Sequence, residues 1–247
     1  MKALITGGSS GIGFEMAKYL NFLGHELILV GTNKEKLETI QTHFNKCKII
    51  VMDLSENSKL KELYVLTKNE DIDILINCAG FGVHGKFSET DLNEELKMIR
   101  VNIDAVHMLT KLFLKDMKKK NYGYILNVSS SAAFQPGPLM AAYYATKAYV
   151  LRLTQAVHYE LKKGKANVVV SCLCPGPVAT NFNKRIGINF SVKPLKASFV
   201  AKYAIDKMFK RKLVIVPGIK MKLVRTFERF LPDNLIMKFA YNIQKNK

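Results

Sequence analysis

Tyr143 and Lys147 are the two residues whose types and spacing suggest chemistry most directly. A phenol with an unperturbed pKa of about 10 is a poor base near neutral pH. A neighbouring ammonium stabilises the phenolate and lowers its pKa toward working pH. On one helix, a separation of four positions places both side chains on the same face. The pair is therefore a candidate acid–base centre, although an ordinary helix pair has the same spacing.

Three consecutive serines, Ser129 to Ser131, follow the apolar run from Tyr124 to Val128. Such a run predicts a buried strand, and reactive groups in an open α/β sheet gather at the carboxyl ends of strands. If the strand continued, Ser130 would face one side, and Ser129 and Ser131 would face the other. A hydroxyl at this place can orient a reacting oxygen.

A glycine-rich stretch near the start predicts a phosphate site. Residues 2–6 form a short apolar run typical of a strand, residues 7–13 contain four glycines, and residues 14–23 have a helical pattern. Free N–H groups and the positive dipole end at a helix N-terminus favour an anion, and missing Cβ atoms let a pyrophosphate approach the backbone. By itself this signal is weak, because a Gly/Ser turn also forms without a ligand.

In combination, Thr6-Gly7-x-x-x-Gly11-x-Gly13 and Tyr143-x-x-x-Lys147 resemble the short-chain dehydrogenase/reductase family, in its single-domain branch. The glycines do not fit the G-x-G-x-x-G fingerprint of other dinucleotide-binding proteins. The resemblance covers residues 1–217 and implies Ser130, from its distance to the tyrosine, as the catalytic serine. It also implies that Asn102 holds a water of a proton relay. The predicted catalytic residues are therefore Asn102, Ser130, Tyr143 and Lys147.

The resemblance further implies a nicotinamide cofactor. Asp53 with Leu54 matches an adenine contact, residues 77–80 resemble an N-A-A-G motif with Cys78 in place of an Ala, and residues 175–180 match a P-G-x-V-x-T loop. Each also has a structural alternative: a turn at Asn77, a helix cap at Asp53, a strand end at Pro175. The predicted cofactor-binding residues are Gly7, Ser9, Ser10, Gly11, Ile12, Gly13, Thr32, Asn33, Lys34, Asp53, Leu54, Asn77, Ala79, Gly80, Tyr143, Lys147, Pro175, Gly176, Val178 and Thr180.

The end of the second predicted strand bears on the choice of cofactor. An NAD site places an Asp or Glu there to accept from the ribose 2′-hydroxyl, and this carboxylate repels a 2′-phosphate. The chain has Thr32, Asn33 and Lys34 instead, with no acidic residue before Glu35. These residues favour NADP(H) over NAD(H), although position 32 lacks the Arg of many NADP relatives and Lys34 equally suits a solvated first turn.

Apolar runs that alternate with helical patterns predict a doubly wound parallel α/β sheet with helices on both faces. We expect one catalytic domain over residues 1–217 and a C-terminal helical segment over 218–247. Residues 181–198 interrupt the last crossover and suggest a substrate lid, with Phe182, Ile186, Ile188 and Phe190 as apolar members. The expected strands are 2–6, 26–30, 47–52, 72–77, 123–129, 167–173 and 213–216, and one long helix is expected over 140–162.

The four cysteines lack the spacing of a metal site or a disulfide framework, so no metal is expected. They have the pattern of reduced thiols in the cytoplasm. No leader is expected before the strand that begins at Lys2, and no apolar run approaches the length of a membrane span.

The net charge of +18 is concentrated toward the C-terminus, where residues 207–247 carry eleven Lys or Arg against two acidic residues, a net +9. Residues 219–231 place Leu223, Val224, Phe227, Phe230 and Leu231 at helical spacing among basic residues. Such a helix can lie weakly on an anionic membrane. The simpler interpretation is that the apolar side, including Phe227, Phe230 and Leu231, packs on the domain. No nucleic-acid recognition motif is present.

The sequence thus predicts an NADP(H)-dependent oxidoreductase that interconverts a carbonyl and a secondary alcohol on an apolar small molecule, acting as a reductase. The family implies a homodimer or homotetramer. Enoyl reductases of the superfamily separate Tyr and Lys by six residues, and Val150 in that position disfavours them. The alternative is a nucleotide-binding sensor or membrane-docked scaffold without turnover.

Overall fold

A seven-stranded parallel sheet organises the computed structural model, which describes residues 1–182, 193–228 and 230–245. The strand order is β3-β2-β1-β4-β5-β6-β9, so the predicted doubly wound sheet is confirmed. Each of the longer strands coincides with a buried apolar run, except the edge strand β3, whose residues are partly or fully exposed. The strands are β1 (Lys2–Thr6), β2 (Glu26–Gly31), β3 (Cys47–Val51), β4 (Ile74–Asn77), β5 (Gly123–Val128), β6 (Val168–Leu173) and β9 (Val214–Ile215).

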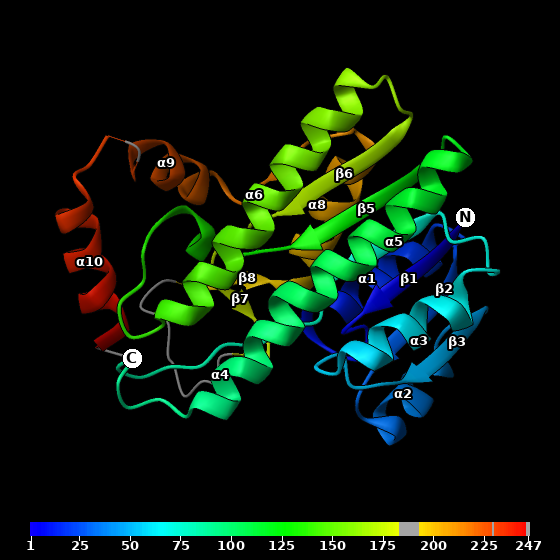
Figure 1. The fold of residues 1–247 in the computed structure, drawn as a ribbon, viewed down its shortest axis with the longest axis horizontal. Coiled ribbons are helices and arrows are strands. Elements are labelled where there is room, and N and C mark those ends of the chain that lie inside the picture. Colours follow the sequence, from blue (N-terminus) through cyan, green and yellow to red (C-terminus); the bar gives the residue numbers. More distant parts are fainter. Residues whose placement is uncertain (183–192, 229, 246–247) are drawn as a thin grey trace.

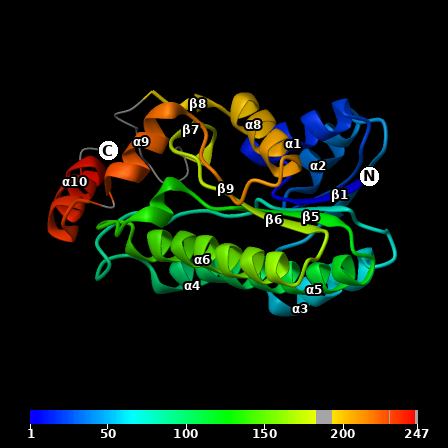
Figure 2. The same cartoon turned by 90° about the horizontal axis from the view of Figure 1, so that it is seen from above.

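Helices cover both faces of the sheet and enclose two main apolar cores (Figure 2). One face packs against α1 (Gly11–Phe22), α2 (Lys34–Gln41) and α8 (Ala197–Phe209). The other packs against α3 (Asn57–Thr67), α4 (Leu92–Ile99), α5 (Val106–Lys119) and α6 (Ala141–Lys163). The start of α1 at Gly11 corrects the prediction of Phe14, because the helix includes the last two glycines of the turn.

A short π-helical segment, Arg100–Ala105, joins α4 to α5 without a break in the helix, and is called the π-turn below. A π-turn accommodates an extra residue and frequently occurs at functional sites. Asn102 lies in this turn and is fully buried. The feature therefore places a buried amide beside the carboxyl ends of the strands.

The chain order reverses between β1 and β4, which are neighbours at the centre of the sheet. The connections after β1 lead to β2 and β3 on one side, and those after β4 lead to β5, β6 and β9 on the other. In doubly wound folds, a crevice for ligands opens beyond the carboxyl ends of the strands at this place.

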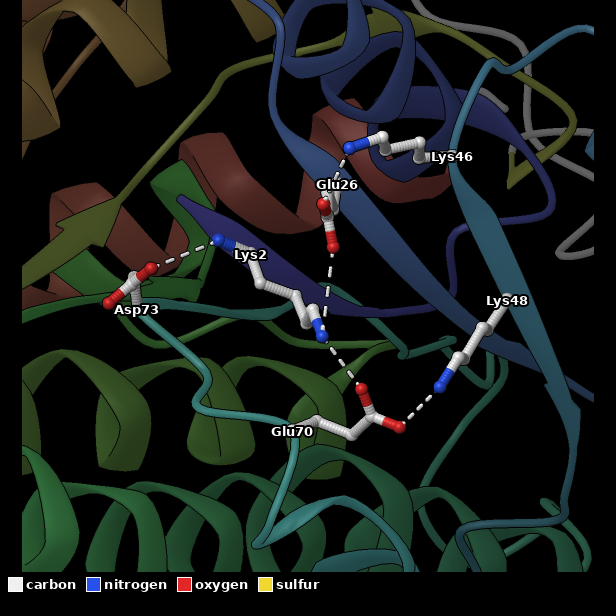
Figure 3. A network of polar contacts seen from close by, with 6 residues as sticks. All are labelled: Lys2, Glu26, Lys46, Lys48, Glu70 and Asp73. Atoms are coloured by element: carbon white, nitrogen blue, oxygen red, sulfur yellow. Dashed lines mark hydrogen bonds and ion pairs between the residues drawn. The ribbon is translucent and has the colours of Figure 1, made fainter.

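The opposite, amino-terminal edge of the sheet carries a network of paired charges (Figure 3). Lys2 Nζ lies 2.7 Å from Glu70 and 3.7 Å from Glu26. Hydrogen bonds from Lys2 and Lys48 lower the pKa of the Glu70 carboxyl to about 2. The Lys2 backbone N–H donates to Asp73 at 3.0 Å. These charges hold the starts of β1, β2 and β3 and the residue before β4 together.

The C-terminal part of the chain lies beyond the carboxyl ends of the strands (Figure 1). Two short strands, β7 (Val178–Ala179) and β8 (Leu195–Lys196), pair in parallel, and the helices α9 (Ile219–Glu228) and α10 (Asp233–Lys245) follow. The predicted lid is thus shorter than expected, because β8 and α8 occupy its last residues. Its Ile186, Ile188 and Phe190 lie outside the described residues.

Helix α9 presents only part of the expected apolar side to the domain. Val224 and, after the end of the helix, Leu231 line a cavity at the carboxyl ends of the strands, whereas Phe227 and Phe230 are 64% and 81% exposed and do not form the predicted packing surface. The helix instead contacts the domain through Met221 and Arg225, which lie against Gly176 and Phe134. None of the helices in the described parts of the chain is long and apolar enough to cross a membrane.

Candidate active site

The glycine turn between β1 and α1 requires its glycines for steric reasons. Gly7 and Gly11 have φ of +67° and +54°, in the left-handed region. A Cβ on Gly7 would lie 2.9 Å from backbone atoms of Ala79, and one on Gly13 would overlap the carbonyl oxygen of Gly7. Ser10 is the N-cap of α1 and makes no side-chain capping bond. The first turn of α1 thus presents N–H groups that its own cap leaves for an anion.

Thr6 links this turn to the next strand. Its hydroxyl accepts hydrogen bonds from the backbone N–H groups of Cys78 and Ala79, each at 3.1 Å. The loop after β4 is therefore fixed against the glycine turn. A Cβ on Gly80 would lie 3.3 Å from the Lys147 ammonium, so this loop also passes close to α6.

Tyr143 and Lys147 lie on α6, as predicted from their spacing, and both are buried. Lys147 Nζ is 5.7 Å from the centroid of the Tyr143 ring and donates to the carbonyl oxygen of Val128 at 3.2 Å. Phe182, from the segment expected to form a lid, packs on the other side of the tyrosine with ring centroids 5.6 Å apart. The phenol is thus enclosed by α6 and the chain after β7.

The electrostatic environment of Tyr143 differs from the sequence argument. Burial raises the pKa of the Tyr143 phenol above its ordinary value, and a hydrogen bond with Ser130 opposes this rise without cancelling it. Burial also lowers the pKa of Lys147. The expected lowering of the tyrosine pKa by the ammonium is therefore wrong for this state of the protein, because desolvation dominates. A protonated phenol is suited to donate a proton.

The three serines separate into different roles. Ser129 is buried and donates to the backbone carbonyl of Lys147 at 2.7 Å, which anchors α6 to the end of β5. Ser130 interacts with Tyr143 and accepts from the N–H of Ala132 at 3.1 Å. Ser131 begins a short 3₁₀ turn. Ser130 is thus the serine that the structure places against the phenol.

Asn102 holds the loop after β4 rather than facing the pocket. Its amide donates to the carbonyl of Phe81 at 2.9 Å and to Thr146 at 3.1 Å, and its oxygen accepts from the Phe81 N–H at 3.2 Å. Both amide protons are therefore used within the protein. A relay water bound at this place would have to accept its hydrogen bond from a main-chain N–H or donate to a main-chain carbonyl, since the Asn102 amide protons are already used.

Asn77 also belongs to the interior. It is 2% exposed, and its amide donates to Thr110 at 3.1 Å and to Asn127 at 2.8 Å. Asn127 continues the chain of bonds to Thr154 on α6 at 3.0 Å. The predicted cofactor contact is thus a buried amide that fastens the ends of β4 and β5 to α5 and α6.

The loop after β6 covers the glycine turn. Ser131 donates its backbone N–H to the carbonyl of Pro175 at 2.8 Å. A Cβ on Gly11 would lie 3.3 Å from Thr180, so the two loops are in close contact. Between them and α6 opens a cavity of about 690 Å³ with mostly apolar walls. Its lining includes predicted residues from five segments, which are the glycine turn, the loop after β4, the turn after β5, α6 and the loop after β6: Gly7, Ser10, Gly11, Ile12, Ala79, Gly80, Ser130, Tyr143, Lys147, Pro175, Gly176, Val178 and Thr180.

The remaining predicted cofactor residues lie outside this lining. Gly13 belongs to α1 and Asn77 to β4, and the others lie toward the ends of β2 and β3. Ser9 lies beside Gly31, since a Cβ built on Gly31 would be 3.1 Å from the Ser9 hydroxyl. Thr32 is exposed. Asn33 caps α2 by accepting from the N–H of Lys36 at 2.7 Å. Lys34 lies 3.7 Å from Glu38 and is largely exposed. The end of β2 thus has Ser9 and Thr32 beside it, and the first carboxylate that the structure pairs with Lys34 is that of Glu38 on α2.

Asp53 closes a turn after β3 and accepts from the Ser55 N–H at 2.9 Å. Burial raises the pKa of its carboxyl, but hydrogen bonds from Ser55 and the nearby Lys97 outweigh this effect and keep the pKa below its usual value. Leu54 is buried. Asp53 is thus a half-exposed, ionised group at the edge where an adenine would lie.

The sequence patterns missed two polar residues of the pocket, Glu228 on α9 and Gln244 on α10. Gln244 donates to the hydroxyl of Tyr144 at 2.7 Å. Among the described residues, the buried oxygen Oε2 of Glu228 has no hydrogen-bond partner, and burial raises the pKa of this carboxyl to about 7. Neither residue belongs to a motif, since only the fold of the C-terminal helices brings them to the site.

The raised pKa of Glu228 predicts a dependence of stability on pH. The carboxyl ionises near pH 4.5 when unfolded but near 7 when folded, so the folded state loses relative stability as pH rises through this window. The melting temperature of Glu228→Gln should match the wild type below about pH 4.5 and exceed it above about pH 7. Glu38→Gln, at an exposed position, controls for the loss of a charge. A gap that does not change with pH would contradict this assignment.

Comparison with known proteins gives consistent matches. The sequence pattern of the family described as short chain dehydrogenase matches residues 1–189. An uncharacterized oxidoreductase of Staphylococcus epidermidis is 32% identical over 203 residues, which cover 81% of this chain and 86% of the relative. A short-chain dehydrogenase from Sphingobium yanoikuyae, solved in complex with NADPH, is 28% identical with a TM-score of 0.83 and covers 88% of each chain. A bulky-bulky ketone specific alcohol dehydrogenase from Comamonas testosteroni is 26% identical, with a TM-score of 0.79, and covers 94% of this chain and 98% of its own.

Proposed function

Because this chain belongs to the short-chain dehydrogenase family and is an NAD(P)-dependent oxidoreductase, we propose that it reduces the carbonyl group of an apolar ketone with NADPH. The observation that carries this proposal is the convergence of Ser130, Tyr143 and Lys147 on one pocket. They come from two separate segments, β5 with its following turn and α6. Packing alone does not require a buried phenol, hydroxyl and ammonium at the same place.

The residues around the glycine turn fit a dinucleotide. Gly7 and Gly13 leave no space for a side chain, and the first turn of α1 presents its N–H groups beside an N-cap that makes no side-chain bond. A pyrophosphate would be held by these N–H groups. The nicotinamide end would lie between the loop at Pro175 to Thr180 and the Lys147 ammonium. Bound NADPH would supply the hydride.

The protein's own groups perform the proton and orientation steps. Tyr143, kept protonated by burial, donates its proton to the carbonyl oxygen as negative charge develops there. Ser130 donates a hydrogen bond to the same oxygen and positions it. Lys147, fixed by the carbonyl of Val128, holds the ribose and stabilises the phenolate once the proton has left. The phenol is therefore in the acid form that the reductive direction requires.

The preference for NADPH rests on the end of β2. A 2′-phosphate at this place would meet the hydroxyls of Ser9 and Thr32 and no carboxylate before Glu35. Lys34 is close enough to contribute charge, although Glu38 lies 3.7 Å from its ammonium. The NADPH-bound structure from Sphingobium yanoikuyae supports this choice.

The pocket favours a bulky, apolar substrate. Part of its wall comes from α9, α10 and the turn between them, through Val224, Leu231, Ile236, Phe239 and Ile243, and burial of apolar groups there drives binding. The specificity of the Comamonas testosteroni relative for bulky ketones supports this substrate class. A sensor or scaffold without turnover is the weaker alternative, since Ser130, Tyr143 and Lys147 all line the pocket.

The test is a panel of ketones and secondary alcohols, with NADPH and NADH compared at the nicotinamide absorbance. Bulky ketones with apolar substituents on both sides should give the highest kcat/KM, with NADPH preferred. Secondary alcohols with NADP⁺ should react more slowly near neutral pH. Stoichiometric cofactor binding without turnover of any carbonyl would instead favour the sensor.

We also propose a homodimer or homotetramer formed through the outer layer of α4, α5 and α6 (Figure 2). Exposed apolar side chains on this layer include Leu92 and Leu96 on α4, at 67% and 38%, and Tyr159 on α6, at 59%. Sedimentation velocity at micromolar concentration should give a mass of two or four chains of 27.9 kDa. A species of one chain would contradict this part of the proposal.

We further place the protein in the cytoplasm, with a weak contact between its C-terminal segment and an anionic membrane. The exposure of Phe227 on α9 and of Phe230 after it supports this contact, because a membrane could take up these apolar side chains.

A further inference from the structure

A second cavity lies beside α9, on the opposite side of that helix from the substrate pocket. It has a volume of about 540 Å³ and is formed by α8, β9 and α9. Four cationic side chains line it, together with Tyr203, Thr226 and the strand residues 214–216. These cations are Lys207, Lys212, Lys222 and Arg225. Within the parts of the chain that the structure describes, no acidic side chain forms an ion pair with any of the four.

Aromatic rings hold three of these four cations in place without neutralising them. The ammonium groups of Lys207 and Lys222 lie 5.5 and 5.6 Å from the centroid of Tyr203. The Arg225 guanidinium lies 4.9 Å from the centroid of Phe134. A cation over a ring keeps its full charge. The groove therefore combines several positive charges in ordered positions, an arrangement that favours a multivalent oxyanion such as a phosphate.

The basic groove adjoins the exposed apolar stripe of α9. Ile219, Leu223 and Phe227 repeat every four residues and are 75%, 53% and 64% exposed. Each residue turns an α-helix by about 100°, which places this stripe directly beside the side that carries Lys222 and Thr226. The side with Met221 and Glu228 faces the substrate pocket. Charge and apolar surface thus meet along one edge of the helix.

We propose that the groove and the stripe together bind an anionic phospholipid, with the headgroup phosphate among Lys207, Lys212 and Lys222 and the stripe in the acyl region. The proposal rests on the membrane contact included in the proposed function and gives it a site. A lipid suits the surface better than a soluble phosphate, because a soluble ligand leaves Ile219, Leu223 and Phe227 in water. The net charge of +18 would attract the chain to a negative surface.

The experiment measures binding of the full chain to vesicles of phosphatidylcholine, with and without phosphatidylglycerol, by co-sedimentation. Wild-type protein should bind the anionic vesicles at least about tenfold more tightly, and the difference should shrink with added salt. Lys207→Gln with Lys212→Gln should reduce this binding by about 25-fold, at about fivefold per charge. Lys61→Gln with Lys118→Gln removes two exposed charges elsewhere and should have a much smaller effect.

A second pair of variants tests the apolar stripe. Leu223→Ser with Phe227→Ser should weaken binding to anionic vesicles, whereas Phe22→Ser with Val65→Ser, at exposed positions on other helices, should not. Melting temperatures and ketone reduction without vesicles verify that each variant folds. Because vesicle binding needs neither substrate nor cofactor, it remains informative if the protein reduces no ketone.

Equal binding to neutral and anionic vesicles would overturn the proposal, and so would equal losses of binding in the groove variants and in their control variants. Binding of glycerol phosphate without binding to vesicles would also overturn it, in favour of a soluble anion.

Discussion

Replacing Tyr143 with phenylalanine should lower kcat for ketone reduction by about a thousandfold while leaving NADPH affinity nearly unchanged. The substitution removes the proton donor but keeps the ring that packs against Phe182. Cofactor affinity, measured by calorimetry without substrate, separates the loss of chemistry from a loss of the binding site.

Tyr144→Phe is the matched control, because the two rings are neighbours with centroids 6.1 Å apart. The Tyr144 hydroxyl accepts a hydrogen bond from Gln244, whereas the Tyr143 hydroxyl interacts with Ser130. We expect a loss of less than about tenfold, typical of one neutral hydrogen bond. If both variants lost activity equally, Tyr143 would not be the proton donor.

Placing an aspartate at Thr32 should reverse the cofactor preference. The new carboxylate would repel the 2′-phosphate and accept from a 2′-hydroxyl, so the ratio of kcat/KM for NADPH to that for NADH should fall by about a hundredfold. The measurement is this ratio, with saturating ketone, for wild-type and variant enzyme.

Thr39→Asp introduces the same charge at an exposed position further along α2 and should leave the ratio close to that of the wild type. A wild-type enzyme that already prefers NADH would refute the interpretation of β2. An equal fall of the NADPH-to-NADH ratio in Thr32→Asp and Thr39→Asp would refute it as well, because the fall would then arise from net charge alone.

The sheet and the acid–base pair could be predicted because their signals are local. Apolar runs located the long strands, and the spacing of Tyr143 and Lys147 placed both on one face of α6. The glycines of the first turn could be predicted for the same reason, since the φ values of Gly7 and Gly11 are set by the turn itself.

Other features depend on contacts between distant segments, and no local pattern contains them. Helical periodicity gave the apolar stripe of α9 but not the side that faces the domain, which depends on Met221 against Gly176 and Arg225 against Phe134. Asn77 matched a motif, yet its amide bonds to Asn127, brought beside it by the register of β4 and β5. The pKa of Tyr143 was misjudged because burial is a tertiary property.

The π-turn between α4 and α5 limits how this part of the chain can change in length. The helix from Leu92 to Lys119 contains an extra residue at the point where Asn102 ties down the loop at Phe81. Deleting one residue would restore regular α-helical hydrogen bonds but rotate the preceding part of the helix by about 100° relative to the rest. Met98, which packs in the same cluster as Tyr143, would then leave its place. This helix can therefore tolerate substitutions on its outer face. A deletion or insertion of one residue would instead turn Met98 and Asn102 relative to each other, so that both could no longer contact the site at once.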